Sequence, residues 1–502
     1  MRKIAVGWLL VCLSALFSAC IEKEYITIAP EEEPQDQSSY TVMMYGCGGG
    51  NLDRSMVLNI QEALLAGSSE RVKFTGQVKF SDRFQQTEVL SGTQRFIVGS
   101  TPERWYTPVE VLDTELPLYD PENLADFIRW SKEQCPADEY ILMLWNHGGA
   151  WLPEDDVPSH RAIIYDDVLD SEGLTLEDLV AGVKASDTHL KMIYFDACLM
   201  GMAEVLVGVS ECADYALGAS HVTPGLGGDY NSLLHHLKHS TNFEQAMAAY
   251  CRETVSHWSV SDMPLDLKLV DLREVDHLLS EIKVFAGYLE EAARVSVEYL
   301  AAHDGQLLLD DSDEFMIAYS LFRAVDSCYH YDGDVDKNGY AAYPYYDLLS
   351  LAEVLANKMV HSYTARYVDI ASRLNRAFGK TIVCQEVTSI LNGKPVTMGV
   401  SIVDASVWRD YKYDTAYPTL AFEKKTNWGK WLSINPFTPK NNPNPNTLVW
   451  GDSDDEEGGD DEEGDDDEEG DDEETPEDGA DEEESEEELA AEIAMLLELI
   501  GK

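Results

Sequence analysis

Cysteine pairing motifs are missing from this 502-residue chain. No Cys-x-x-Cys pair occurs, which argues against a zinc ribbon. Of the nine cysteines, Cys12 and Cys20 lie in an N-terminal apolar segment, so an odd number remains for the rest of the chain. Because an odd number cannot pair completely, we expect no disulfide framework and at least one free thiol.

Positive charge is also scarce. The chain has 36 Lys and Arg residues against 93 Asp and Glu residues, for a formal net charge of −57. Residues 452–488 hold 27 acidic residues and no basic one, and removing these 27 charges from −57 leaves about −30 for everything else. An acidic surface repels phosphate backbones, so we expect no nucleic acid partner, whereas cationic peptides and metal ions suit this charge.

The first apolar run is too short to span a bilayer. It reads MRKIAVGWLLVCLSALFSAC, with Arg2 and Lys3 at its start and small residues before Cys20. This pattern predicts a secretory signal over residues 1–20, and its ending is typical of a bacterial lipoprotein signal that places a lipid on Cys20. An ordinary cleaved signal is the alternative. Residues 21–39 lack apolar periodicity and predict a flexible tether. From the signal and the tether together, we expect an exported protein that is lipid-anchored to a bacterial membrane at the cell surface.

From residue 40 onward, short apolar runs alternate with amphipathic segments. This alternation predicts an α/β fold with a mostly parallel central sheet that helices cover on both faces. The expected strands lie at residues 40–46, 140–149, 190–200 and 214–220. The expected helices lie at residues 55–67, 123–135, 174–186 and 201–213.

The pattern continues with less regular spacing beyond residue 264. Further strands are expected at residues 265–272, 380–387, 393–403 and 417–426, and helices at residues 273–300, 314–326 and 346–376. Asn392 and Gly393 predict a hairpin-like turn between two of these strands. The folded part should end near residue 447. We expect a disordered acidic tail over residues 448–488 and an amphipathic helix over residues 489–502.

Two chemically reactive residues lie at the ends of predicted strands. His147 lies near the end of the apolar run at 140–149 and Cys198 near the end of the run at 190–200, so both should face the crevice at the carboxyl ends of the strands. An imidazole can remove the proton of a neighbouring thiol and later protonate a leaving amine. The glycine after His147 lets the backbone approach a substrate, and the amides of Gly148 and Cys198 are natural donors to an oxyanion.

Three motifs carry a family resemblance: NHGGAW, YFDACLMGMAEV and ASHVTPGLGGDY. Together they resemble the clostripain family of cysteine peptidases, within the wider clan of caspases and gingipains, over roughly residues 40–405. The resemblance implies a caspase-like α/β/α sandwich with added C-terminal strands and helices, so that residues 40–447 form the peptidase domain and its extension. It also implies a monomeric cysteine endopeptidase in which a Cys198/His147 dyad needs no third acid and no cofactor.

Substrate preference follows from the same resemblance. Family members cleave after Arg or Lys with carboxylates in the specificity pocket, and Asp196 stands at the family's acidic position two residues before the cysteine. Asp229 is the candidate for a second pocket acid, although Gly228 stands where the family often has Trp. The resemblance further implies a zymogen that cleaves itself at a basic residue between the histidine and the cysteine, and Arg161 is the candidate.

Calcium often supports activity in this family, and DGDVDKNGY offers the opening half of an EF-hand-type loop. Its candidate ligands are Asp332, Asp334, Asp336 and Asn338. Tyr345 stands where the loop's bidentate Glu belongs, so a plain turn is the alternative. The pair His235 and His239 could likewise bind a metal, but a solvated helix face is expected.

Two alternatives to an Arg- or Lys-specific peptidase stay open. One is a catalytically silent surface lipoprotein that keeps the fold and binds basic peptides. The other is a caspase-like peptidase of different specificity, which an acidic pocket argues against.

Overall fold

The computed structural model describes twelve stretches of the chain, and the statements below concern these residues. They are 38–48, 52–80, 92–101, 106–151, 163–166, 172–258, 265–331, 345–359, 363–388, 399–403, 415–437 and 450–451. All of them belong to the compact unit Gln37–Lys502. The predicted signal and tether, the acidic tail and the terminal helix lie outside the described residues. Within the described part of the chain, no helix combines the length and the apolar character that crossing a bilayer requires.

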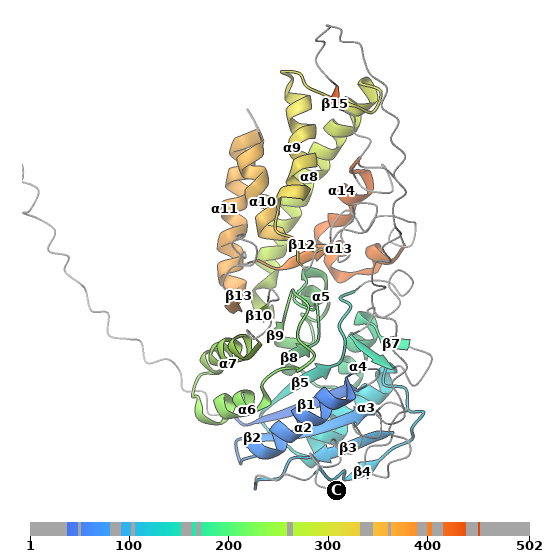
Figure 1. Ribbon diagram of the computed structural model, residues 1–502, viewed down its shortest axis with the longest axis vertical. Coiled ribbons are helices and arrows are strands. Elements are labelled where there is room, and N and C mark those ends of the chain that lie inside the picture. The colour runs from blue at the N-terminus through green and yellow to red at the C-terminus, as the bar shows by residue number, and fades with distance from the viewer. Residues whose placement is uncertain are drawn as a thin grey trace, which may run out of the picture. The chain divides into compact units, whose positions relative to one another are not determined.

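One sheet of nine described strands forms the centre of the fold (Figure 1). Its order is β13-β10-β9-β8-β5-β1-β2-β3-β4. The five strands from β9 to β2 run parallel, and antiparallel strands extend both edges. The bounds are β1 Tyr40–Cys47, β2 Val72–Lys79, β3 Thr93–Ile97, β4 Glu110–Val111, β5 Glu139–Trp145, β8 Leu190–Asp196, β9 Ala213–Gly218, β10 Asp266–Asp271 and β13 Ile382–Val387.

Helices cover both faces of this sheet. Successive residues of β1 alternate between two hydrophobic cores, since Met43 and Tyr45 belong to one and Val42 and Met44 to the other. The first core includes residues of α3 (Pro121–Gln134), α4 (Leu176–Ala185) and α5 (Ala203–Gly208). The second includes residues of α2 (Asp53–Ala66), α6 (Tyr230–His239) and α7 (Phe243–Trp258). The predicted α/β/α sandwich is therefore confirmed.

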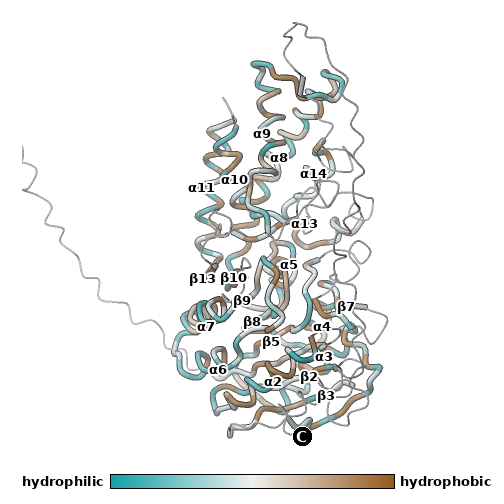
Figure 2. Tube along the Cα trace, viewed as in Figure 1, coloured by the Kyte–Doolittle hydropathy of each residue, from teal (hydrophilic) through white to brown (hydrophobic). Residues whose placement is uncertain are grey.

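The C-terminal half adds helices that extend from the part of the sheet around β10 and β13 (Figure 1). They are α8 Val275–Ala302, α9 Asp313–Ser327, α10 Leu348–Lys358, α11 Thr364–Thr381, α13 Ala421–Thr426 and α14 Trp428–Ile434, with 3-10 turns at Leu272–Glu274 and Tyr417–Thr419. Apolar and polar residues alternate around the turns of α9, α10 and α11 (Figure 2), as in helices that pack along one face. Short strand pairs complete the fold: β6 Ile164–Asp166 with β7 Glu172–Leu174, β12 Tyr345–Asp347 with β14 Ser401–Val403, and β11 Leu307–Leu308 with β15 Trp450–Gly451.

Two sequence predictions in this half are wrong. The helix expected over 346–376 is interrupted, because α10 ends at Lys358 and Met359 adopts an extended conformation before α11 begins. The strand expected over 417–426 is a 3-10 turn followed by α13, whose Phe422 and Thr426 are buried one helical turn apart. In both cases long-range packing overrides the local pattern. The turn expected at Asn392 and Gly393 lies outside the described residues, while β13 pairs with β10 and β14 pairs with β12.

Candidate active site

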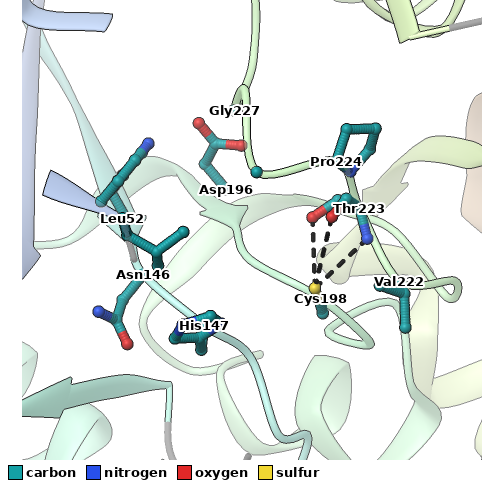
Figure 3. Close-up of a pocket in the computed structure, with 11 residues that line it drawn as sticks. Leu52, Asn146, His147, Asp196, Cys198, Val222, Thr223, Pro224 and Gly227 are labelled. Atoms are coloured by element: carbon teal, nitrogen blue, oxygen red, sulfur yellow. Dashed lines mark hydrogen bonds between the residues drawn. The ribbon is translucent and has the colours of Figure 1, made fainter. Parts of the chain in front are cut away.

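The register between β5 and β8 brings the two predicted reactive residues together. These parallel strands pair so that Trp145 lies opposite Asp196, the last residue of each strand. His147 and Cys198 each follow two residues later, and both line one cavity (Figure 3). The expectation that both residues face the same crevice is therefore met in the structure.

The cavity that they share has a volume of about 220 Å³. It also receives Asp196 from the end of β8 and a wall from the loop that follows β9. The lining residues are Leu52, Trp145, Asn146, His147, Asp196, Cys198, Val222, Thr223, Pro224, Gly225 and Gly227. A thiol, an imidazole and a carboxylate thus border one space large enough for a substrate side chain.

The Cys198 sulfur lies against Thr223 (Figure 3). The Thr223 amide donates to Sγ at 3.3 Å, and the Thr223 hydroxyl lies 3.5 Å from it. The thiol in turn lies 3.7 Å from the Thr223 carbonyl oxygen, to which it can donate. Leu199, the next residue, has φ of 63°, a conformation that is uncommon for a side chain of this size and that concentrates at functional turns.

Gly148 makes the close approach between the loops that carry His147 and Cys198 possible. A Cβ atom at this position would lie 2.0 Å from the Cys198 carbonyl oxygen and 2.7 Å from its amide nitrogen. Contacts this short are impossible for any other residue without movement of the backbone. The backbones of Gly148 and Cys198, the two predicted oxyanion donors, therefore lie in direct contact.

Asp196 is a buried carboxylate at the cavity. Its Oδ2 accepts hydrogen bonds from the Gly228 amide at 2.9 Å and from the Tyr230 hydroxyl at 2.8 Å. Burial nevertheless raises the pKa of Asp196 from 3.8 to about 6, because the hydrogen bonds offset only part of the lost hydration. Near neutral pH this site holds a negative charge that a bound cation would stabilise.

The second predicted pocket acid has a different position. Asp229 is the N-cap of α6, where its carboxylate accepts from the Ser232 amide at 2.9 Å, and it is not among the cavity-lining residues. Glu62 of α2 lies beside the same helix end, where its Oε2 accepts from the Tyr230 amide at 3.2 Å. Burial, together with the charge of Asp229, raises the pKa of Glu62 to about 7.

Asn59 is a site residue that the sequence analysis missed. Its Nδ2 donates to the carbonyls of Leu226 and Gly228 at 3.0 and 3.3 Å, and its Oδ1 accepts from the Trp145 indole at 3.0 Å. Asn59 thereby ties the wall of the cavity to the end of β5. A polar residue within an amphipathic helix gives no sequence signal of such a role.

Glycines form the wall that Asn59 holds. Gly227 has φ of 69°, and a Cβ at Gly228 would lie 2.2 Å from the Tyr250 hydroxyl and 2.3 Å from the Tyr194 hydroxyl. No larger side chain fits at Gly228 in this arrangement. The two tyrosines, which hydrogen-bond to each other at 2.8 Å, occupy the space that a bulkier residue would need.

A buried polar network holds the other side of the same loop. The carboxylate of Asp266 accepts from the amides of Ser220 and His221 and pairs with Lys268 at 3.0 Å. The Tyr329 hydroxyl lies 3.0 Å from His221 Nε2, which links the loop to the C-terminal helices. The residues that approach the Cys198 sulfur are therefore positioned from both halves of the chain.

Several predicted sites lie outside the described residues. These are the lipidation site Cys20, the cleavage site Arg161 and the calcium ligands Asp332, Asp334, Asp336 and Asn338. Across the residues that are described, no group of three or more His, Cys, Asp or Glu side chains could hold a metal ion. His235 and His239 lie on the exposed face of α6, as expected for a solvated helix surface.

Known proteins resemble this chain in both sequence and fold. A profile of the Clostripain family matches residues 101–434. Clostripain from Hathewaya histolytica is 25% identical over 474 residues, which cover 85% of this chain and 86% of that protein. An inactive protease zymogen from Parabacteroides distasonis has a TM-score of 0.54 at 17% identity, covering 78% of this chain and 98% of its own. A secreted cysteine protease from Bacteroides thetaiotaomicron, in complex with an irreversible peptide inhibitor, has a TM-score of 0.53 at 14% identity, covering 78% and 99%.

At these identities the solved structures show a shared fold, and the sequence profile carries the assignment. The profile match spans more than half of the chain. It includes β5 and β8, which present the candidate histidine and cysteine at the cavity. The chain belongs to the clostripain family and is a cysteine endopeptidase.

Proposed function

We propose that this endopeptidase cleaves after Arg or Lys, with Cys198 as nucleophile and His147 as general base. The observation that carries the proposal is the single cavity of about 220 Å³ in which Cys198, His147 and Asp196 meet. The thiol supplies the nucleophile, the imidazole supplies the base, and the buried carboxylate supplies the preference for a cation.

The chemistry requires two proton transfers through His147. The imidazole takes the thiol proton, and the Cys198 sulfur attacks the carbonyl carbon of the scissile peptide bond. The oxyanion that forms accepts hydrogen bonds from the amides of Gly148 and Cys198. Protonated His147 then gives its proton to the leaving amine, and a thioester remains. A water molecule that loses a proton to His147 then hydrolyses the thioester and releases the acid product, and the proton on His147 returns to the Cys198 sulfur.

Specificity rests on Asp196. A substrate Arg or Lys that enters the cavity can pair with the carboxylate, and this pairing is stronger in a partly desolvated site than in water. Asp229 caps α6 away from the cavity lining, so the proposal does not require it as a direct contact. Its charge adds to the negative potential around the helix end beside Glu62.

Three further proposals concern the whole protein. Export and lipid attachment at Cys20 follow from the N-terminal sequence, and intact-mass measurement of membrane-extracted protein tests them. Self-cleavage after Arg161 is supported by the proposed preference for basic residues and by the position of Arg161 between His147 and Cys198. Persistence of uncleaved, fully active protein would contradict it. Calcium dependence through Asp332 and its neighbours is tested by comparing turnover in chelator and in calcium.

The central experiment measures hydrolysis of matched fluorogenic peptides that end in Arg, Lys, Leu or Asp. The wild-type chain should turn over the Arg and Lys peptides, and Cys198→Ala and His147→Ala should each reduce kcat/KM by at least about 10³-fold. Cys212→Ala is the matched control, because Cys212 is buried immediately before β9 and does not line the cavity.

Each outcome decides between the candidate functions. Turnover of Arg or Lys peptides that survives Cys198→Ala would refute the assignment of the nucleophile. Preferential turnover of the Asp or Leu peptide would refute the role of Asp196. Silence of freshly reduced protein towards every peptide, together with tight binding of Arg-containing peptides, would favour a silent surface lipoprotein that binds basic peptides.

A further inference from the structure

Two thiols outside the active site lie close together although they are far apart in the sequence. Cys251 of α7 and Cys384 of β13 have their sulfur atoms 3.9 Å apart, across a sequence separation of 133 residues. Helix α7 packs directly on β13, where Cys251 belongs to a buried core and Cys384 packs against that core. The two sulfurs would have to approach by about 1.9 Å to reach the 2.05 Å length of a disulfide bond.

A local irregularity of β13 places Cys384 against α7. The pairing with β10 slips between Leu269 and Val270, so that Val383 is the extra residue of a bulge next to Cys384. Val383 and Cys384 both pack against the core that contains Cys251, although consecutive strand residues ordinarily face opposite sides. The bulge therefore presents this thiol to the helix.

We infer that Cys251 and Cys384 form a site of covalent cross-linking, which a low-molecular-weight disulfide converts from two thiols to one intramolecular disulfide. The site is separate from the catalytic cavity, because neither cysteine lines it. An odd number of cysteines leaves at least one thiol free, but it does not exclude a single pair such as this one.

The two thiols suit different steps of this reaction. Cys384 lies on the edge strand of the sheet and is partly exposed, whereas Cys251 is fully buried. The hydrogen bond with Cys251 lowers the pKa of Cys384, which outweighs the opposing effect of its burial, while burial raises the pKa of Cys251 well above its usual value. Cys384 is therefore the thiol that reacts first.

The electron and proton balance is that of two exchange reactions. The Cys384 thiolate attacks one sulfur of the small disulfide, which forms a mixed disulfide and releases one thiolate. Cys251 then loses its proton and attacks the Cys384 sulfur, which forms the Cys251–Cys384 bond and releases a second thiolate. Two protein thiols are oxidised, and one small disulfide is reduced to two thiols.

The cross-link would act on the helix that supports the cavity wall. The Trp258 indole of α7 donates to the Gly227 carbonyl at 2.8 Å, and the Tyr250 hydroxyl bonds to that of Tyr194 at 2.8 Å. Cys251 is the next residue after Tyr250, so a bond to Cys384 would fix α7 to the edge of the sheet directly beside these contacts. Oxidation should therefore rigidify α7 and stabilise the fold.

The experiment uses the full chain carrying Cys198→Ala, so that neither catalysis nor the active-site thiol interferes. The protein is equilibrated with glutathione and glutathione disulfide at a series of ratios, quenched with acid and alkylated. Peptide mapping by mass spectrometry should show one cross-linked peptide pair that contains Cys251 and Cys384. Oxidation should raise Tm by about 5 °C and slow amide exchange in α7.

Variants separate the cross-link from general oxidation. Cys251→Ser and Cys384→Ser should each abolish the cross-linked peptide and the oxidation-dependent shift in Tm, whereas Cys212→Ala should retain both. If serine at these sites unfolds the protein, the Ala and Val replacements Cys251→Ala and Cys384→Val provide the same comparison. A stable glutathione adduct on Cys384 without a cross-link, or two thiols that stay reduced in glutathione disulfide alone, would overturn the inference.

Discussion

Replacing Asp196 by Asn should stabilise the folded protein at neutral pH while it removes the recognition of basic substrates. Asp196 is buried beside the cavity, and burial raises its pKa from 3.8 to about 6. A carboxyl group whose pKa is higher in the folded state than in the unfolded state opposes folding wherever it must ionise. The charge that the site offers to a substrate is thus a charge that weakens the free enzyme.

The magnitude follows from the difference between the two pKa values. A difference of about 2 units corresponds to about 3 kcal/mol of unfolding free energy. Well below pH 3.8 the carboxyl is protonated in both states and has no effect. As the pH rises from about 4 to about 6, the carboxyl loses its proton in the unfolded state before it does so in the folded state. The free energy of unfolding of the wild-type protein therefore falls over this range. Asn cannot ionise, so the free energy of unfolding of the variant should not fall for this reason.

The assay is urea unfolding of Cys198→Ala and of Cys198→Ala with Asp196→Asn, between pH 4.5 and pH 7.5. The Asn variant should be more stable by about 3 kcal/mol at pH 7.5, and the advantage should shrink towards pH 4.5. Asp214→Asn is the control of opposite sign, because His189 and Lys191 outweigh the effect of burial and lower the pKa of Asp214. Equal stabilities at pH 7.5, or an advantage that does not depend on pH, would contradict the raised pKa of Asp196 in the folded state.

The same variant should lose the preference for a basic substrate. Removing one partner of a buried charge pair costs on the order of 2 to 5 kcal/mol, so kcat/KM for an Arg peptide should fall by at least about 30-fold. In the wild-type enzyme, KM for the Arg peptide should rise as the pH falls below about 6, since the carboxylate that binds the cation becomes protonated. The KM for a neutral peptide should not rise. A KM for the Arg peptide that also stays constant below pH 6 would contradict the binding of the basic side chain by Asp196.

Three further substitutions test two contacts at the cavity and one buried ion pair of the core. Gly148→Ala should reduce kcat/KM by at least about 100-fold in a folded protein, because its Cβ would lie 2.0 Å from the Cys198 carbonyl oxygen; unchanged kinetics would disprove that contact. Lys79→Met should cost about 3 to 5 kcal/mol in urea unfolding because it leaves Asp166 charged and buried, and adding Asp166→Leu should recover most of the loss. Equal loss in the single and double variants would contradict this pairing. Trp258→Phe removes the indole donor to the cavity wall and should raise KM several-fold with little change in kcat.

The sequence was sufficient to predict the parts of the site that follow parallel strands. His147 and Cys198 come directly after buried apolar runs, and parallel strands in adjacent positions bring their carboxyl ends together. That argument needs only the order of elements and the chemical types of two residues. It does not need side-chain packing, which is why it holds at the level of individual residues.

Other parts of the site and of the fold depend on contacts between segments that are distant in the sequence. Asn59 and Glu62 lie on α2. Asn59 contacts the loop before α6 and Glu62 contacts the first residue of α6, both more than 160 residues away, yet in the sequence they look like ordinary polar positions of an amphipathic helix. Asp229 illustrates the converse, because a motif suggested a pocket acid and the local backbone made it a helix cap. The segment 417–426 shows that β-type composition yields to burial of one helical face.

The burial of Asp196 at the cavity explains why so many contacts fix the residues around it. A carboxylate whose ionisation opposes folding stays in place only if other contacts fix its environment, and Gly228, Tyr230 and Asn59 supply those contacts from the loop, α6 and α2. Each of these contacts spans a long sequence separation, so a change in any one element would shift the carboxylate relative to Cys198. Because α7 supports the same wall through Trp258, oxidation of the thiol pair Cys251 and Cys384 should alter substrate binding before it alters the chemistry of the proposed dyad.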